Sequence, residues 1–287
     1  METIIIDKET GEILEEGVFR SYKQIKKSAE YFEIKNIKEE KQSLTMKEYG
    51  NFIWILYRVQ ENYNDLINPS NLSKLMFVST YLGYSGYLVF SNGKLIDKAK
   101  LRELLMISVV EYNKFYKEML LKEIIIEKDN KIYINEHLFF KGKIDKLPFT
   151  INKNITRLYI NSIREIYNKT NIKSHKQLSY IFKILPYVNI KYNIICFNPL
   201  EDNLEKLQPM NFLDFCDTIN YNKSNYRNLK KIFKECYSIQ NEYIISFVSN
   251  NNNILDTTLF INPRLYYAGN NWDKVEILGF FCKNKTV

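Results

Sequence analysis

Residues 132–142 of this chain, Ile132-Tyr-Ile-Asn-Glu-His-Leu-Phe-Phe-Lys-Gly142, return near its end as residues 259–269, Leu259-Phe-Ile-Asn-Pro-Arg-Leu-Tyr-Tyr-Ala-Gly269. Most of the paired positions keep size or aromatic character. Four pairs are identical: Ile134/Ile261, Asn135/Asn262, Leu138/Leu265 and Gly142/Gly269. An offset of 127 positions is far too long for a solenoid of short units. The repeat therefore indicates a duplicated domain.

The repeat continues upstream at a constant offset of 114 positions. Apolar residues recur there at spacings of three, four and seven, which is the pattern of helices with one buried face. They are Leu101, Leu105, Ile107, Tyr112, Phe115 and Met119 in the first copy, and Phe215, Ile219, Tyr221, Tyr226, Leu229 and Phe233 in the second. Short polar breaks at 106–108 and 220–222 divide these stretches. The pattern predicts two helices joined by a turn in each copy, over 98–105 and 109–120, then over 211–218 and 223–235.

Two β-rich runs follow each pair of helices. In the first copy they flank Lys128-Asp129-Asn130, a composition typical of a hairpin turn, and in the second they flank residues 250–253. The runs are 123–127 and 131–135, then 243–248 and 257–262, and each copy also carries an earlier helix (72–82 or 175–185) and a strand (87–90 or 193–197). Because the offset grows from 114 to 127, we expect the 13 additional residues around the second hairpin loop. This order predicts an α+β fold made of two tandem winged helix-turn-helix domains.

The expected organisation has three parts. Residues 1–42 form a small hairpin, Thr3–Ile6 with Glu12–Leu14, and a charged helix over 22–42; residues 43–146 form winged-helix domain 1 and residues 147–287 form winged-helix domain 2. The joint is expected at 143–154, around Pro148. No signal peptide and no apolar run of roughly 18 residues is present, so we expect a cytoplasmic protein with no membrane partner. The four scattered cysteines fit reduced thiols better than a disulfide framework.

The net charge of +8 is unevenly distributed. Residues 1–146 contain 23 Lys and Arg against 22 Asp and Glu, whereas residues 147–287 contain 18 against 11. A basic half favours a polyanionic partner, because neutralising phosphates releases counterions and dominates affinity. The alternative is a surplus of charge that only keeps the protein in solution.

The second helix of the second copy concentrates this charge. Its apolar stripe directs the polar residues outward, and N-terminal residues of such a helix usually reach base edges. Asn suits adenine and Arg suits guanine, while Lys holds phosphates. We therefore expect Asn225, Arg227 and Asn228 near the bases, and Lys223, Lys230, Lys231 and Lys234 mainly on the DNA backbone. Ser224 is expected on the same DNA-binding face. The alternative is a solvated amphipathic helix without a partner.

The corresponding helix of the first copy has a nearly neutral outer face. We expect Glu111, Asn113, Lys114, Lys117 and Glu118 there, and two acids would oppose phosphate binding. Two readings stay open. Asn113, Lys114 and Lys117 contact DNA while Lys98, Lys100, Arg102 and the wing residues Lys128 and Lys131 supply charge, or the first copy binds a protein or forms a dimer. The uncharged second wing, 250–253, suits either a minor groove or a free loop, and segment 20–41 reads first as an exposed helix with paired charges.

Signs of catalysis are missing from the sequence. His137 and His175 have no Cys or carboxylate at metal-ligand spacing, and no Gly-rich phosphate loop or nucleophile motif is present. We expect Asp214 and Asp217 to cap or solvate their helix pair. The prediction is no enzyme, no catalytic residue, no metal and no cofactor, with a metal-dependent nuclease built from scattered carboxylates as the alternative.

The terminal pattern from Phe260 to Gly269 resembles the closing strand of winged-helix replication initiator proteins of low-GC plasmids and phages. The opening Asp7-Lys-Glu-Thr-Gly-Glu-Ile-Leu14 is similar to their starts. With the repeat, the resemblance covers most of residues 70–270, and it implies origin binding, recruitment of host replication factors and, in some members, repression of the protein's own promoter. We therefore expect a sequence-specific double-stranded DNA-binding protein, either replication initiator or transcriptional regulator. Host replication or transcription proteins and a second copy are further candidate partners, and the alternative is a winged-helix module that binds a protein instead of DNA.

Overall fold

The computed structural model describes residues 3–6, 13–17, 50–56, 67–143, 155–235, 238–248 and 257–267. Residues 1–48 and residues 49–287 form two separate compact units. In the first unit, β1 (Thr3–Ile6) pairs antiparallel with β2 (Ile13–Gly17), with Thr3 opposite Gly17. The predicted hairpin is thus confirmed, while the helix expected over 22–42 lies outside the described residues.

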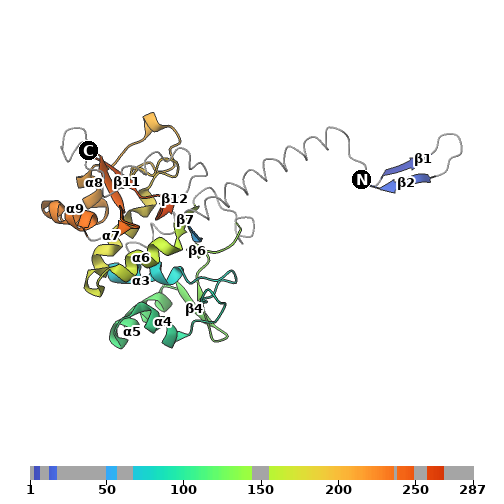
Figure 1. Ribbon diagram of the computed structural model, residues 1–287, viewed down its shortest axis with the longest axis horizontal. Coiled ribbons are helices and arrows are strands. Elements are labelled where there is room, and N and C mark those ends of the chain that lie inside the picture. The colour runs from blue at the N-terminus through green and yellow to red at the C-terminus, as the bar shows by residue number, and fades with distance from the viewer. Residues whose placement is uncertain are drawn as a thin grey trace. The chain divides into compact units, whose positions relative to one another are not determined.

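The second unit contains both copies of the repeat (Figure 1). The first copy contributes β3 (Phe52–Leu56), α3 (Pro69–Ser79), α4 (Lys98–Leu105), α5 (Val109–Leu121), β4 (Ile125–Lys128), β5 (Lys131–Ile134) and β6 (Phe139–Phe140). The second contributes β7 (Ile155–Tyr159), α6 (Ile160–Lys169), α7 (His175–Ile184), α8 (Phe212–Thr218), the 3-10 turn η5 (Lys223–Asn225), α9 (Tyr226–Glu235), β8 (Ser238–Ile239), β9 (Glu242–Tyr243), β10 (Ile245–Val248), β11 (Thr258–Ile261) and β12 (Tyr266–Tyr267). Further 3-10 turns occur at Ile172–Ser174, Leu185–Tyr187 and Leu204–Lys206. The fold is α+β, with small antiparallel sheets.

Polar caps set the starts of the paired helices in both copies. The Asp97 carboxylate accepts from the backbone N–H of Lys100 at 2.8 Å, and the equivalent Asn211 forms a capping box with Asp214. Ser108 caps α5 and Asn222 caps η5, again at equivalent positions. These caps explain why the starts predicted for the paired helices agree with the structure within one residue, apart from the 3-10 start of the last helix. The earlier helix expected over 72–82 instead spans 69–79, because the Asn68 side chain caps it three residues sooner.

The turn between the paired helices has the same backbone conformation in the two copies. Met106 ends α4 with φ 52°, and Asn220, 114 positions later, has φ 56°. Asn adopts this left-handed conformation readily, but Met does so at a cost in strain. The duplicated turn has therefore been kept in the first copy with an unfavourable residue.

Asn135 and Asn262 hold their hairpins in the same way. The backbone N–H of each donates to the strand before the hairpin, Asn135 to the Ile124 carbonyl and Asn262 to the Ile244 carbonyl, both at 2.9 Å. Each side-chain amide donates to the preceding carbonyl, of Glu123 in one copy and Tyr243 in the other, at 3.1 and 2.9 Å. Each bend thereby satisfies backbone groups, at a half-buried Asn135 and a fully buried Asn262, which explains why this Asn is identical in both copies.

The 13 additional residues of the second copy lie in two places, not only around the hairpin loop as expected. Ile124 and Ile244 occupy equivalent positions at an offset of 120, so six additional residues precede the hairpin. They form part of the short β8–β9 hairpin between α9 and β10. The remaining seven fall between β10 and β11.

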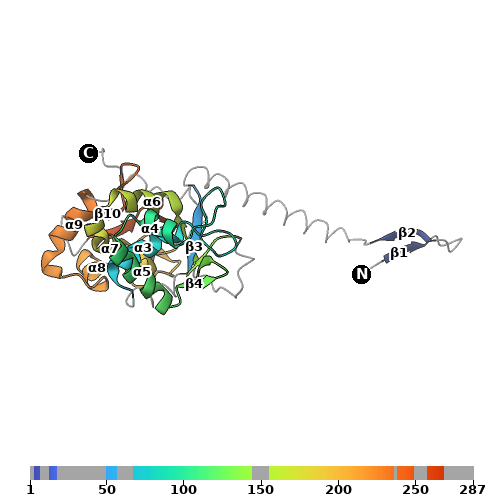
Figure 2. The same ribbon diagram turned by 90° about the horizontal axis from the view of Figure 1, so that it is seen from below.

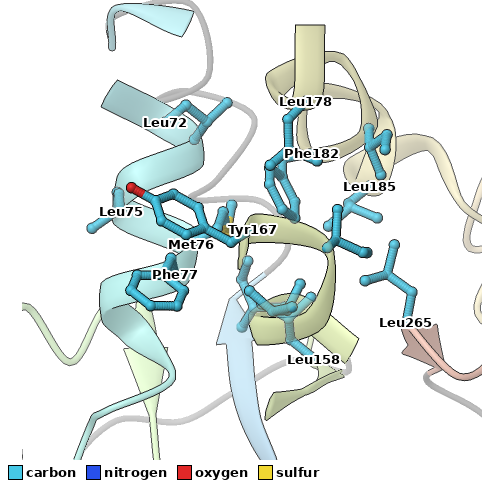
Figure 3. Packing of buried hydrophobic residues seen from close by; sticks show 14 of the residues in the cluster. Leu72, Leu75, Met76, Phe77, Leu158, Tyr167, Leu178, Phe182, Leu185 and Leu265 are labelled. Carbon is cyan, nitrogen blue, oxygen red and sulfur yellow. The ribbon is translucent and has the colours of Figure 1, made fainter. Parts of the chain in front are cut away.

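The two copies share one four-stranded sheet of order β12-β7-β3-β6, in which β3 and β7 pair at the centre. They also share a hydrophobic core, in which α3 packs along α7. Figure 3 shows Leu72, Met76 and Phe77 of α3 facing Tyr167 of α6 and Phe182 of α7. The Phe77 and Tyr167 rings stack with centroids 4.0 Å apart.

This core separates the two pairs of short helices. In Figure 1, α4 and α5 lie at the lower end, while α8 and α9 lie on the other side of α3, α6 and α7. Seen from below in Figure 2, α8 and α9 occupy the left edge, and β4 lies at the opposite edge beside β3. Each pair of helices therefore has its own outward surface.

Candidate nucleic-acid interface

The polar face of α9 and its preceding turn is exposed as the sequence predicts. Leu229, Ile232 and Phe233 of α9 are buried in the core. The exposed residues are Lys223, Ser224, Asn225, Arg227, Asn228, Lys231 and Lys234. Four of these described residues are cationic and none is acidic, so together they offer hydrogen-bond donors and positive potential on one surface.

Contacts within the copy orient some of these cations. The Lys223 ammonium forms an ion pair with Asp217 of α8. The Arg227 guanidinium donates to the Tyr226 hydroxyl at 3.2 Å and lies over its ring, 5.7 Å from the centroid. The phenol thus engages the Nε–H of the guanidinium, whereas the N–H groups on its two terminal nitrogens are further donors of the same side chain.

Lys230 departs from the expected arrangement because it is half-buried. Its ammonium lies over the ring of Phe247 in β10, 5.3 Å from the centroid. Burial, and then the nearby charge of Lys234, lower the pKa of Lys230. Lys230 therefore links α9 to the hairpin, which makes it a weaker candidate for a phosphate contact than Lys231 or Lys234.

The acids of α8 are engaged within the helix pair. The Asp214 carboxylate accepts from the backbone N–H of Asn211 at 3.1 Å, as part of the capping box. Asp217 is paired with Lys223. The expectation that these acids cap or solvate the helix pair is confirmed, since Asp214 caps α8 and Asp217 is exposed and paired with Lys223.

The outer face of α5 differs from the expectation at Glu118. Glu111, Asn113, Lys114 and Lys117 are exposed, but Glu118 turns toward the start of α3. Its carboxylate accepts from the backbone N–H of Asn68 at 2.9 Å and from the Asn71 amide at 2.5 Å. Burial opposes ionisation of Glu118, but the hydrogen bonds from Asn71, Asn68 and Lys122 outweigh it and lower the pKa of this carboxyl. One of the two acids counted against phosphate binding is therefore removed from the face.

Apolar side chains take the place of charge on α5. Val110 is 63% exposed and Leu121 is 73% exposed, at the two ends of the same face. Val109 is exposed on its flank. Val110 was not among the residues expected to contact DNA, although the constant offset of 114 makes it the equivalent of Ser224. This correspondence could have predicted its place on the outer face of the helix.

The β4–β5 hairpin, which the sequence predicts as a wing, lies beside α4, where the Glu127 carboxylate forms an ion pair with Lys98. Asp129 and Asn130 both have positive φ, as in the two-residue turn that suits a twisted hairpin. Lys128 is exposed, while the Lys131 ammonium lies over the Tyr87 ring, 4.7 Å from its centroid. The corresponding loop of the second copy, 250–253, lies outside the described residues.

The histidines and the described cysteines are the other reactive side chains, and three of these four, His175, Cys196 and Cys216, are buried. His137 is exposed in the turn before β6, and its backbone N–H donates to Asn135. His175 is buried against the Tyr167 ring, with centroids 4.5 Å apart. Burial raises the pKa of the Cys196 thiol to about 12 and that of Cys216 to about 11, which disfavours the nucleophilic thiolate.

Neither a metal-binding cluster nor a membrane-spanning helix occurs in the described part of the chain. There, no three His, Cys, Asp or Glu side chains lie together in a way that could hold a metal ion. Within the same residues, no helix combines the length and the apolar character needed to cross a membrane. Comparisons with protein-family models, with curated proteins and with solved structures find no match to this chain.

Proposed function

We propose that the chain is a sequence-specific double-stranded DNA-binding protein of a phage or plasmid, acting in the cytoplasm as a replication initiator or transcriptional regulator. Its two copies would be tandem winged helix-turn-helix domains. In each, the second short helix (α5 or α9) would enter a major groove and the β-hairpin would be the wing.

The observation that carries the proposal is the composition of the α9 face. Arg227, Asn225 and Asn228 bring the donors that read guanine and adenine, and they lie at the N-terminal end of the helix. Lys231 and Lys234 follow along the same exposed face, where a phosphate backbone would pass. No carboxylate interrupts these residues.

The order of elements in each copy supports the same conclusion. In the first copy the backbone N–H of Leu88 donates to Ile132, and in the second the N–H of Ile195 donates to Leu259. Each hairpin thus also pairs, through an isolated bridge, with the extended segment before the helix pair. Helix, extended segment, helix, turn, helix and hairpin follow one another in each copy, which is the order expected of a winged helix-turn-helix.

A second candidate function comes from the first copy. The exposed Val109, Val110 and Leu121 of α5 suit a protein surface, so the first copy would then recruit a host replication or transcription protein, or a second copy of the chain. In that case the second copy alone would bind DNA.

The proposal is tested by selecting binding sites from random duplex DNA with the full chain. Enrichment of a defined sequence, lost in an Arg227→Ala variant, is the expected result. Failure to enrich any sequence, with the purified chain folded, would reject the function proposed for α9.

A further inference from the structure

The two recognition helices carry different chemistry at equivalent positions. With the offset of 114, Asn113 corresponds to Arg227, and Lys117 corresponds to Lys231. Val110 corresponds to Ser224. The buried positions follow the same register, since Phe115 and Leu229 are both fully buried. The two helices therefore present equivalent residues outward, and differences between them are differences in what each can recognise.

The exposed line on α5 runs from Val110 through Asn113, Lys114 and Lys117 to Leu121. Successive helical residues turn by about 100°, so positions three, four, seven and eleven after Val110 all remain on its side. Each of these residues is exposed. Two apolar side chains, an amide and two ammonium groups therefore share one face.

We propose that α5 reads A·T base pairs in the major groove. Val110 packs on the C5 methyl group of a thymine, and the Asn113 amide forms hydrogen bonds with an adenine. This proposal rests on the proposed function of the chain as a DNA reader. Thymine alone among the four bases presents a methyl group in that groove, and Asn pairs with the N6 and N7 edge of adenine. Arg227 of the second copy would instead read guanine, so the two half-sites differ in composition.

Charge on this face favours DNA over a protein as the occupant. Lys114 and Lys117 separate Val110 and its neighbour Val109 from Leu121 at the other end of the helix, which divides the exposed apolar surface into two small parts. Lys117 also holds the register position of Lys231, where the second copy would contact phosphate. Leu121 lies about 16 Å along the helix axis from Val110, beyond the N-terminal part of the helix that contacts bases.

The proposal is tested by removing the methyl groups on each side of the contact, the C5 methyl of thymine on the DNA and the two γ-methyl groups of Val110 on the protein. The full chain and its Val110→Ala variant are titrated with a selected duplex and with the same duplex carrying deoxyuridine at single thymines. Deoxyuridine keeps the base pair but lacks the C5 methyl. Wild type should lose about fourfold in affinity at one thymine of the first half-site, as expected for about 0.8 kcal/mol per buried methyl-sized group. Val110→Ala should bind the unmodified duplex more weakly and show no further loss at that thymine.

Leu121→Ala is the matched control, because it removes an exposed apolar side chain from the same face. It should keep both the wild-type affinity and the wild-type loss on deoxyuridine. If no thymine distinguishes wild type from Val110→Ala while binding stays selective and sensitive to Arg227→Ala, the inference on α5 is wrong and its face belongs to a protein partner. If wild type itself binds without sequence selectivity, the proposed function fails first.

Discussion

Trp54 and Arg157 face each other as direct partners at the centre of the β3–β7 pair. They are also equivalent residues of the repeat. Trp54 lies opposite Phe140 of β6, and Arg157 lies opposite Tyr267 of β12. Phe140 and Tyr267 correspond because they are 127 positions apart, which is the offset of the hairpin repeat. A pseudo-twofold axis therefore passes between Trp54 and Arg157. Each copy supplies the partner of the other, as protomers do in a symmetric dimer.

The contact between these two residues should stabilise the whole second unit. The Arg157 guanidinium lies over the rings of Trp54 and Phe52, 5.1 and 5.4 Å from their centroids, and burial lowers its pKa. Arg157→Ala should lower the free energy of unfolding by roughly 1–3 kcal/mol, because a desolvated cation–π contact and its packing are lost. Chemical denaturation measures this. Lys169→Ala, which removes a surface ion pair with Glu165, should cost less than about 0.5 kcal/mol. Equal effects of the two variants would contradict the account.

The duplicated asparagines offer a second prediction. Asn262→Ala should lower the free energy of unfolding by roughly 1–3 kcal/mol, because the Glu242 carboxylate and the Tyr243 carbonyl lose a donor in a buried place. Asn135→Ala should cost less, since Asn135 is half-buried and water can replace its amide. Denaturant titration of both variants measures the two costs. A larger cost for Asn135→Ala than for Asn262→Ala would contradict the claim that burial of the amide decides the cost.

A third prediction concerns pH. Burial, and then the charge of Lys74, lower the pKa of His175 to about 4 from its ordinary value of 6.5. The folded state thus binds the proton less well than the unfolded state, so the contribution of His175 to stability is complete above about pH 6.5 and is lost as the pH falls toward 4. Unfolding curves of wild type recorded between pH 6.5 and about pH 4, the interval between the two pKa values, should show this loss.

His175→Gln provides the comparison, because it removes the titrating group from the buried site. Its stability should depend less on pH over the same interval. His137→Gln, which removes an exposed histidine, should keep the wild-type dependence. If His175→Gln and wild type lose stability in parallel, other groups govern acid unfolding.

Local signals made much of the helical part predictable from the sequence. Asp97, Ser108, Asn211 and Asn222 mark helix starts by their side-chain chemistry, and the apolar stripes identify the buried faces. The central β3–β7 pair was not predicted, because no local pattern reveals which strands pair across about one hundred residues. Glu118 was placed outward because helix periodicity leaves flanking positions undecided, whereas its inward direction depends on Asn68 and Asn71, about fifty residues earlier in the chain.

The face of α9 could be predicted because one helix carried the whole pattern. The half-burial of Lys230 could not, since it depends on Phe247 in a strand that lies apart in the sequence. Val110 was missed for a different reason. An exposed valine carries no signal of its own, and it gains meaning only through its register with Ser224.

The fourth prediction separates base reading from phosphate contact on α9. Arg227→Ala should lose roughly 1–3 kcal/mol of binding free energy on the selected site and relax one base position. Lys231→Ala should instead weaken binding to selected and unrelated DNA alike. Competition binding with single-base variants of the site distinguishes the two. Identical specificity profiles for both variants would mean that Arg227 does not contact a base.

The most direct test of the central claim is a salt-titrated binding assay of the full chain and of an Arg227→Ala/Lys231→Ala variant on the selected duplex. Lys173→Ala/Lys206→Ala removes the same charge from exposed positions of the second copy outside the helix pair, and serves as control. We predict sequence-selective binding whose logarithm falls linearly with the logarithm of salt, unchanged in the control. The α9 variant should bind much more weakly. The slope of log affinity against log salt should also become shallower, by about one for the lost phosphate contact of Lys231. Weak wild-type binding, or equal binding by the α9 variant and the control, would contradict the claim that α9 reads DNA.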